Sequence, residues 1–246
     1  MKSLRVGLVV LSAFLFASFV AMGAASKQPA GKVVDSGTFE IVVDGKRVGT
    51  ETFTIHDQGV NNVTTSQIKI AAGTAKAEQS SVLEMTNAGG LVRYSWKETS
   101  PSKSQSNIEV TQNAVVQHIL LPENKKPLDV PYMVSPSTMI LDDNAFVHRQ
   151  LLVWRYLRGS CGMKDGKQTC DTVKLGVLVP AQHVMAIISV EYVGNEKLAI
   201  KGVERDLAHI RIMSDDVEWD LWADPADAYK VVRIYIPSNK TEVLRN

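Results

Sequence analysis

The chain has 246 residues, of which 27 are Lys or Arg and 26 are Asp or Glu, so its formal net charge is +1. A nearly neutral chain argues against a nucleic-acid partner, because nucleic-acid-binding proteins present a basic face to the phosphates. Hydrophobic residues make up 45% of the sequence, as in ordinary globular proteins.

The first 25 residues have the pattern of a secretory signal peptide. Lys2 and Arg5 precede an uncharged apolar run that ends in small residues at positions 23–25. Cleavage there predicts an exported protein of the periplasm or the extracellular space. The alternative is an uncleaved anchor, because Val6 to Ala25 is about 20 residues and just long enough to span a membrane. In that case this segment would be the contact with the membrane.

Residues 26–36 are expected to form a flexible linker, and residues 37–246 a single β-rich domain. That domain opens on "FEIVVDGKRVGTETFTI", in which alternating apolar residues flank Asp44-Gly45, a strong hairpin signal. Phe39 and Ile41 share a face with Phe53 only if the connection has an odd residue count or the hairpin carries a bulge. We expect a three- or five-residue connection.

Alternating runs separated by turn residues continue along most of the chain, which is typical of an antiparallel meander. In the second half, the expected turns lie at Gly194-Asn195, at Asp215-Asp216 and at residues 224–227. We expect strands near residues 38–44, 47–56, 62–71, 75–86, 91–98, 105–111, 114–121, 173–178, 183–193, 196–202, 205–213, 217–224, 229–236 and 241–245.

The pattern changes in the middle of the chain. Residues 122–137 contain four prolines and predict a crossing outside the sheet. Residues 139–159 predict one helix, which Asp142, Asp143 or Asn144 can cap and Gly159 can close. Its apolar side must pack on the sheet.

These elements predict a mainly β fold. One large antiparallel meander sheet is expected to curl into a half-open barrel, because so wide a sheet does not stay flat. The single central helix is expected to pack on its concave face. A concave sheet with an apolar lining is also a natural cavity for a hydrophobic ligand.

The two cysteines, Cys161 and Cys170, predict a structural disulfide. If Asp165-Gly166 is a two-residue turn, the cysteines oppose each other at a non-hydrogen-bonded pair, where Cα atoms approach to about 4.5 Å. That distance permits a disulfide, and export leads into an oxidising compartment. The alternatives, a redox pair or a metal site, lack the usual C-x-x-C spacing.

The sequence contains none of the common catalytic or nucleotide-binding motifs. Its five histidines are scattered one to an element, and His148, next to Arg149 on the predicted helix, is the one most worth following. The acidic pairs Asp142-Asp143 and Asp215-Asp216 fit a helix cap and a turn. We therefore expect no catalytic residue, no metal site and no cofactor.

Aromatic and branched residues in the late strands predict a sheet that is apolar on both faces. Trp219 and Leu221 point to one side and Trp222 to the other, and Val231 and Val232 divide in the same way. The helix can cover one face; a ligand, a partner protein or a membrane surface could cover the other, with plain core packing as the alternative. The candidate ligand-binding residues are Phe146, Leu151, Trp154, Trp96 and Trp219.

Four segments follow one another along the chain: the signal peptide, the "G-x-x-V-G-T-E" hairpin (residues 45–51), the mid-chain "MILDDNAFVHRQLLVWRYLR" and the closing "W-x-D-P-x-D" turn (residues 222–227). The order of these segments resembles that of the exported bacterial families of unknown function related to the DUF3108 group. Through them the chain is similar to the LolA/LolB-like fold of periplasmic lipoprotein carriers, a half-open β-barrel lined by a helix. The resemblance implies an envelope protein that holds an acyl chain or a lipid-like molecule.

The sequence is compatible with three functions of this protein. The first is a non-enzymatic periplasmic binding module for a lipid-like or other hydrophobic ligand. The second is an envelope interaction or assembly protein without a small ligand, and the third, more remote, is a hydrolase of an unrecognised type. A lined cavity of several hundred Å³ would favour the first; a His, an acid and a Ser converging inside it would favour the third.

Overall fold

The computed structural model describes residues 31–111, 114–135, 137–143, 145–215 and 217–246. The predicted signal peptide (residues 1–25) lies outside this part of the chain, as do residues 26–30 of the predicted linker. Within the described residues, no helix is long and apolar enough to cross a membrane.

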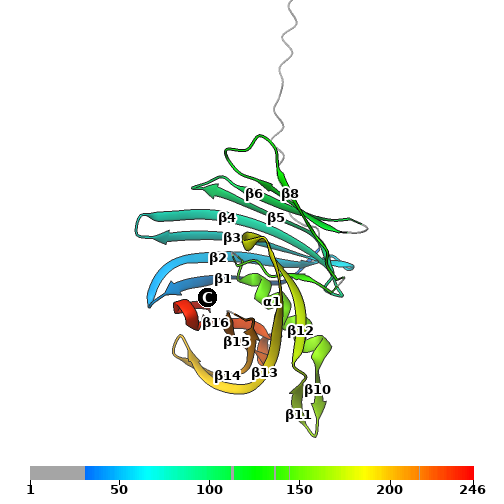
Figure 1. Cartoon of the computed structure of the whole chain (residues 1–246). Coiled ribbons are helices and arrows are strands. Elements are labelled where there is room, and N and C mark those ends of the chain that lie inside the picture. The colour runs from blue at the N-terminus through cyan, green and yellow to red at the C-terminus, as the bar shows by residue number, and fades with distance from the viewer. Residues whose placement is uncertain (1–30, 112–113, 136, 144, 216) are drawn as a thin grey trace, which may run out of the picture.

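A mainly antiparallel sheet of 15 strands makes up most of the fold, as predicted (Figure 1). The first half of the chain forms β1 (Lys32–Val43), β2 (Lys46–Asp57), β3 (Asn61–Ala72), β4 (Ala75–Thr86), β5 (Leu91–Ser100), β6 (Gln105–Val110), β7 (Val115–Leu120) and β8 (Leu128–Tyr132). After β9 (Met139–Ile140) come helix α1 (Val147–Ser160), the hairpin β10 (Cys161–Lys164) and β11 (Lys167–Cys170), and then β12 (Val173–Val179), β13 (Val184–Ile200), β14 (Val203–Met213), β15 (Glu218–Asp224), β16 (Lys230–Ile236) and β17 (Thr241–Arg245).

The two halves of the chain form the two halves of the sheet and meet at its middle. Strands β1 to β8 run outward to one edge, β12 to β17 return from the other, and β1 pairs with β17 where they meet. Neighbouring strands are antiparallel except β9, which pairs in parallel with β12 at the second edge. The sheet is curled, as predicted, but its edge strands β8 and β9 are not paired with each other.

The opening hairpin differs from its prediction. Asp44 and Gly45 form a two-residue turn, with φ of 48° and 74°, in place of the expected three- or five-residue connection. A bulge restores the side-chain parity instead: Ile41 pairs with Gly49 and Val42 with Arg47, so Val48 is the extra residue.

Three other segments also differ from their predictions. Strand β1 already begins at Lys32, so residues 32–36 belong to the sheet and not to a flexible linker. The proline-rich stretch contains the edge strand β8, where Pro131, which has no N–H to donate, pairs opposite Val116. Residues Gly194-Asn195 do not turn the chain: β13 continues through them with a bulge, and the turn comes at residues 201–202.

Helix α1 begins at Val147, after the three residues that were predicted to cap it. Met139 and Ile140 are strand β9, and the N-cap residue is Phe146, whose side chain makes no capping hydrogen bond. Asp142 and Asp143 are therefore not caps, and Asn144 lies outside the described residues. The helix also runs through Gly159 to Ser160, so this glycine does not close it.

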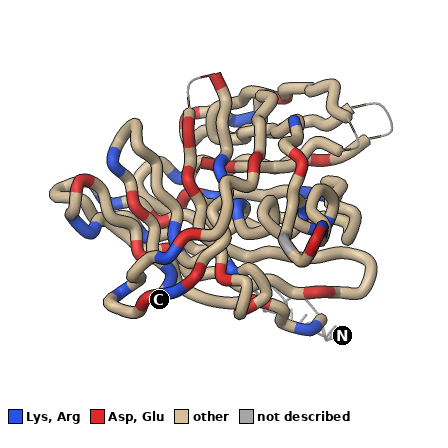
Figure 2. Tube along the Cα trace, turned by 90° about the horizontal axis from the view of Figure 1, so that it is seen from below, with Lys and Arg blue, Asp and Glu red and all other residues tan. Residues whose placement is uncertain are grey.

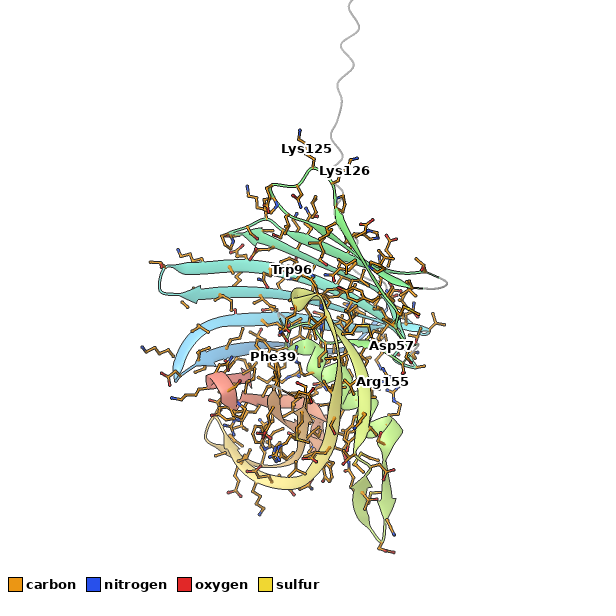
Figure 3. All side chains as sticks on the ribbon, in the orientation of Figure 1. Phe39, Asp57, Trp96, Lys125, Lys126 and Arg155 are labelled. Carbon is orange, nitrogen blue, oxygen red and sulfur yellow. A yellow bond between two sulfur atoms is a disulfide. The ribbon has the colours of Figure 1, made fainter. Side chains whose placement is uncertain are left out.

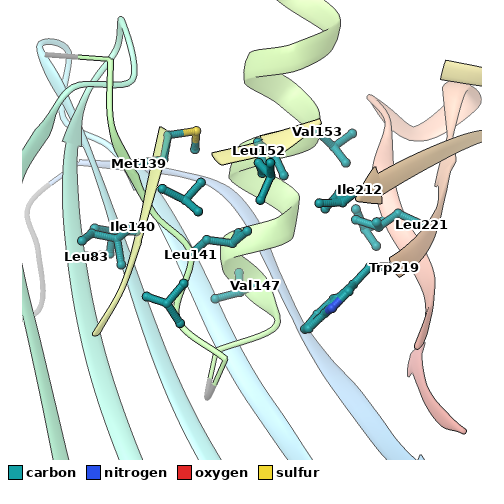
Figure 4. Close-up of a cluster of buried hydrophobic side chains, with 14 of the residues drawn as sticks. Leu83, Met139, Ile140, Leu141, Val147, Leu152, Val153, Ile212, Trp219 and Leu221 are labelled. Carbon is teal, nitrogen blue, oxygen red and sulfur yellow. The ribbon is translucent and has the colours of Figure 1, made fainter. Parts of the chain in front are cut away.

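The helix lies in the hollow of the curled sheet and is enclosed on most sides. Figure 4 shows Val147, Leu152 and Val153 of α1 between two walls. One wall is formed by Leu83 and residues 139–141, and the other by Ile212, Trp219 and Leu221. The buried surface of α1 is therefore wider than the apolar side predicted from the sequence, because the polar residues His148, Arg149 and Gln150 are buried as well.

Gln150 connects α1 to the C-terminal half of the sheet by two hydrogen bonds. Its Nε2 donates to the Tyr229 carbonyl at 3.0 Å, and its Oε1 accepts from the Val231 N–H at 2.6 Å. A buried amide that satisfies two backbone groups fixes the position of the helix along β16.

A seam runs between the two sheet edges. Only residues 133–138 separate β8 from β9, so Tyr132 and Met139 lie within roughly 25 Å of each other. Across this seam, Nε2 of the buried Gln117 donates to the Pro180 carbonyl at 3.0 Å and to Ser106 Oγ at 2.8 Å, while its Oε1 accepts from the Tyr132 hydroxyl at 2.8 Å. The two sides of the curled sheet are joined here by a side chain and not by strand pairing.

The other face of the late strands has a cover of its own. Trp222 and Val232 pack there with Ile200 and Leu207 from the long β13–β14 hairpin, apart from the main core. The guanidinium of Arg233 lies 4.5 Å from the Trp222 ring. The prediction that both faces are apolar is confirmed, and the sheet's own hairpin packs on the second face.

The disulfide prediction is confirmed in both pairing and register. Cys161 is bonded to Cys170 and lies directly opposite it, with the Cα atoms 4.0 Å apart. The β10–β11 hairpin that they close projects from the body beside the end of α1 (Figure 1).

Charged residues of both signs are interspersed over the fold. Figure 2 shows Lys and Arg interspersed with Asp and Glu over the described part of the chain. This mixture agrees with the nearly neutral composition.

Candidate functional site

A cavity of about 900 Å³ lies between the C-terminal half of α1 and the nearby rim of the sheet. The rim is formed by the start of β1, the end of β2, the start of β3, the β4–β5 turn at residues 87–89, the start of β12 and residues 228–229 before β16. A volume of this size lies within the range of about 300–1,000 Å³ that small-molecule sites occupy.

The helix supplies an apolar wall of this cavity. Leu151, Trp154 and Leu157 line it from α1, and each is half-buried. The Trp154 indole is held in place, because its Nε1 donates to the Ala228 carbonyl at 2.9 Å. Met85, Val173 and Leu175 extend the apolar lining onto the strands.

Two arginines supply the polar wall. Arg155 Nη1 donates to the Gly89 carbonyl at 3.1 Å, and Arg158 Nη1 donates to the Asn87 carbonyl at 3.3 Å. Figure 3 shows Arg155 near Asp57, which also lines the cavity. Burial lowers the pKa of the Arg155 guanidinium, because a half-buried charge loses part of its hydration.

The structure does not gather all the predicted ligand-binding residues at this cavity. Leu151 and Trp154 line it, whereas Phe146 lies at the opposite end of α1 and packs on Trp219 with ring centroids 6.2 Å apart. Trp96 lies on β5, well away from Arg155 in Figure 3. Phe146, Trp219 and Trp96 are therefore placed in the core and at the seam.

A second, smaller cavity of about 170 Å³ lies at the seam. Trp96, Ser106 and Ile119 line it from one sheet edge, and Pro180 and His183 from the other. Trp96 Nε1 is buried there without a hydrogen-bond partner among the described residues. The volume is below the usual range of drug-sized ligand sites.

The start of α1 carries a buried polar cluster that the sequence analysis missed. Glu51 of β2 is fully buried; its Oε1 accepts from Ser66 Oγ at 2.6 Å, and its Oε2 accepts from the Val147 N–H at 3.2 Å. Loss of hydration raises the pKa of the Glu51 carboxyl to about 7, although the hydrogen bonds from Ser66 and Val147 oppose this rise. The available signal was its parity, since Glu51 lies on the same strand face as the buried Phe53.

Asp142 joins the same region to β5. Its Oδ2 accepts from the Tyr94 hydroxyl at 2.6 Å, and its backbone N–H donates to His148 Nδ1 at 3.2 Å. Burial lowers the pKa of the His148 imidazole to about 3, with the nearby charge of Arg149 as the smaller cause. His148 is therefore neutral over the ordinary pH range, and Nδ1 is its accepting nitrogen.

Arg149 is also buried at this end of the helix. Its guanidinium lies 3.9 Å from the Trp219 ring centroid, donates to the Ala145 carbonyl at 2.9 Å and contacts Asp143 Oδ1 at 3.4 Å. Burial lowers the pKa of Arg149 to about 10, against the opposing effect of Asp143 and other acids. Cation–π and carbonyl contacts thus hold a charge inside the core.

The convergence of a histidine, acids and a serine here does not have the geometry of a catalytic relay. Ser66 donates to Glu51 and not to His148, and His148 Nδ1 accepts from a backbone N–H. Neither Ser66 nor His148 lines either cavity. A nucleophile and its base must be in hydrogen-bond reach of each other and of a substrate.

A second histidine–acid pair lies on the other face of the late strands. His209 Nε2 and Asp220 Oδ1 are 2.7 Å apart, and the imidazole stacks on Trp222 with ring centroids 4.8 Å apart. Neither cavity includes these residues. Over the described residues, no group of three or more His, Cys, Asp or Glu side chains is arranged to hold a metal ion.

Comparison with protein-family models, with curated proteins and with solved structures finds no match to this chain. The resemblance to the DUF3108-related families and to the LolA/LolB-like fold therefore stays a prediction from the sequence. The function has to be inferred from the cavity and its lining.

Proposed function

We propose that this protein is an exported, non-enzymatic binding module for a lipid-like or otherwise hydrophobic ligand, which it takes into the 900 Å³ cavity beside α1. The cavity is the observation that carries the proposal. Two of the residues predicted to bind ligand, Leu151 and Trp154, line it, and together with Leu157 they form an apolar part of its wall. The predicted signal peptide and the disulfide fit an oxidising compartment outside the cytoplasm.

The position of the cavity supports uptake of a ligand from solution. It lies at the rim of the sheet, next to strand ends and turns, so a ligand can enter without unpairing strands. The main core on the other side of α1 is packed with apolar side chains and fixes the helix wall. A preformed apolar wall on a rigid scaffold lowers the entropic cost of binding.

The alternative is an envelope interaction protein that uses a sheet edge. Strand β8 is an unpaired edge with Leu128 exposed, and Met133 just beyond it is 90% exposed. Exposed edges invite strand addition, but Pro131 on this strand has no N–H to offer a partner strand. The cavity therefore supports the binding module better than β8 supports a strand-addition site.

Native mass spectrometry of the protein purified from a periplasmic fraction, followed by solvent extraction, tests the proposal. We expect a co-purifying lipid at about one per chain, or uptake of the neutral fluorescent probe 1-N-phenylnaphthylamine by the emptied protein. A ligand-free mass together with no probe uptake would contradict the proposal and favour the interaction protein.

A pair of variants locates the bound probe. Leu157→Glu replaces part of the apolar wall with a charged, hydrated side chain and is expected to reduce the affinity for the neutral probe at least about tenfold, because the probe loses apolar contact and the carboxylate loses hydration when the probe binds. Met133→Glu adds the same charge at an exposed site outside the cavity and should leave the affinity unchanged. Equal effects of the two substitutions would place the probe elsewhere.

A further inference from the structure

Two arginines line the cavity beside α1 without a carboxylate oxygen within 4.0 Å among the described residues. Arg155 and Arg158 lie three residues apart on α1, so they share one side of the helix, and both line the cavity. Each donates one hydrogen bond, to a carbonyl of the β4–β5 turn. A guanidinium has five N–H donors, so both side chains keep donors for a further partner.

These two differ from the other arginines of the described residues. Each of the others has a carboxylate oxygen within 4.0 Å, whereas Arg155 and Arg158 have none. The carboxylate that lines the cavity is Asp57, and its Oδ1 accepts from the Gly59 N–H at 2.7 Å. The cavity wall therefore carries two positive charges and one negative charge.

The position of Arg155 is supported by a glycine. A Cβ atom on Gly89 would lie 3.0 Å from Arg155 Cδ and 3.1 Å from its Nε, and Gly89 has a φ of +86°. The turn thus leaves room for the guanidinium to lie against its backbone. A half-buried guanidinium that is held in position without a counter-charge can bind an anion with little further ordering of its side chain.

The helix C-terminus explains only part of this arrangement. Cations are favoured near the last carbonyls of a helix, so arginines at these positions need no ligand by themselves. The apolar wall beside them is the independent observation. Leu151, Trp154 and Leu157 continue from the arginines along α1, so the cavity has one apolar side and one cationic side.

We propose that Arg155 and Arg158 bind the anionic head group, a carboxylate or a phosphate, of a single-chain amphiphile whose hydrocarbon chain lies along Leu151, Trp154 and Leu157. The inference rests on the proposed binding function and names the chemical class of its ligand. Bidentate hydrogen bonding is the usual way in which arginine recognises both head groups. The chain would contact the apolar wall while the head stays at the rim.

Competition against 1-N-phenylnaphthylamine tests this proposal with the purified protein. Hexadecanoate and hexadecyl phosphate are the anionic competitors, and hexadecanol, with the same chain, is the neutral one. We expect at least one anionic competitor to bind about tenfold more tightly than hexadecanol, with the preference falling as salt rises. Comparison of the two anions distinguishes carboxylate from phosphate.

The double variant Arg155→Gln/Arg158→Gln is expected to lose this preference while keeping its affinity for hexadecanol. The double variant Arg155→Lys/Arg158→Lys keeps the charge and should retain part of the preference. Arg47→Gln is the matched control, because Arg47 lies at the other end of β2, is exposed, and pairs with Glu40. Hexadecanol binding reports in every variant whether the cavity is intact.

The outcomes separate this inference from the proposed function. If no probe or competitor binds, the binding module itself is wrong. If hexadecanol and the anions bind equally well, or if the preference survives the glutamine substitutions, the cavity binds hydrophobic ligands but the arginines do not recognise a head group. The inference would also be overturned if the protein bound to vesicles of phosphatidylglycerol but did not bind hexadecanoate or hexadecyl phosphate.

Discussion

The Glu51 carboxylate on β2 caps the N-terminus of α1, with its Oε2 accepting a hydrogen bond from the Val147 N–H at 3.2 Å. The two residues are 96 positions apart in the chain. Phe146, at the N-cap position, makes no side-chain hydrogen bond, and the first turn of the helix contains no acid. An acceptor from the sheet thus satisfies a helix donor that local sequence leaves open.

Replacing Glu51 with Gln tests whether the ionised form of this buried carboxyl destabilises the fold. The folded protein raises the pKa of Glu51 from 4.5 to about 7, so the folded state holds this proton over a range where the unfolded state releases it. The contribution of Glu51 to stability is then fully present below pH 4.5 and falls as pH rises toward 7. Glu51→Gln keeps an oxygen acceptor for Val147 without this loss.

We expect Glu51→Gln to be more stable than the wild type at pH 8, by about 2–4 kcal/mol, and to match it near pH 4. Urea unfolding followed by tryptophan fluorescence at both pH values measures the difference. Glu78→Gln, on an exposed side chain of β4, should change little at either pH. A Glu51→Gln protein that is less stable than the wild type at pH 8 would show that the charge itself is needed.

His148 gives a prediction of opposite sign. Its pKa falls from 6.5 to about 3 on folding, so the stability contributed by the neutral imidazole is present above pH 6.5 and is lost as pH falls. Between pH 4.5 and 6.5 the folded state therefore holds about one extra proton at Glu51 and lacks about one at His148. Glu51 and His148 therefore change the free energy of unfolding with pH in opposite directions, each by about 1.4 kcal/mol per pH unit, and the two effects nearly cancel in the wild type.

Single variants should expose each slope. In Glu51→Gln, the free energy of unfolding is expected to fall as pH drops from 6.5 to 4.5, because the effect of His148 is no longer offset by that of Glu51. In His148→Asn, which keeps an acceptor for the Asp142 N–H, the stability is expected to rise over the same interval. Urea midpoints at half-unit steps of pH measure both curves, and parallel curves for the two variants would contradict the assignment.

Much of the architecture was accessible from the sequence because it depends on local patterns. The pairing of Cys161 with Cys170 follows from counting outward from one turn, and the opposite faces of Trp219 and Trp222 follow from the period of a strand. The helix start was not accessible in this way. Local rules favoured Asp142 or Asp143, whereas the acceptor comes from β2 and depends on how the sheet curls.

The candidate site was only partly predictable for the same reason. The apolar pattern of the helix predicts Leu151 and Trp154 as ligand-binding residues, and both line the cavity. Trp96 is predicted as an aromatic residue of a strand, but its place at the seam depends on which strands form the sheet edges. The carbonyl partners of Arg155 and Arg158 lie in a turn 66 and 71 residues earlier, and no local pattern indicates that these arginines have no carboxylate partner among the described residues.

Gln117 joins the two sides of the seam through a buried amide that bonds to Ser106, Tyr132 and the Pro180 carbonyl. Gln117→Ala removes this partner from the buried Ser106 and Tyr132 hydroxyls, whereas the Pro180 carbonyl still accepts from the His183 N–H at 3.2 Å. We expect a loss of about 2–4 kcal/mol in the free energy of unfolding. Gln67→Ala, at an exposed position of β3, is the matched control.

Hydrogen exchange then distinguishes an opened seam from general loosening. In Gln117→Ala, amide protection is expected to fall most in β8 and β12, which border the seam, and least in β1 and β17 at the middle of the sheet. A uniform loss of protection would mean that Gln117 supports the whole core and does not join its edges.

The projecting β10–β11 hairpin is closed by the disulfide between Cys161 and Cys170. The disulfide closes a segment with a sequence separation of 9, so its loss should increase the entropy of the unfolded chain modestly. We expect Cys161→Ser/Cys170→Ser to lower the free energy of unfolding by about 2–3 kcal/mol. Because β10 and β11 pair only with each other, exchange should quicken in residues 161–170 while the large sheet keeps its protection.

The same variant reports on the cavity. Ser160, next to Cys161, lines the cavity, and the Tyr229 hydroxyl donates to Gln168 Oε1 of β11 at 2.7 Å. A loosened hairpin should therefore weaken 1-N-phenylnaphthylamine binding by a few-fold, far less than Leu157→Glu does. If the serine variant binds the probe as poorly as Leu157→Glu, the hairpin is part of the binding wall and not only its support.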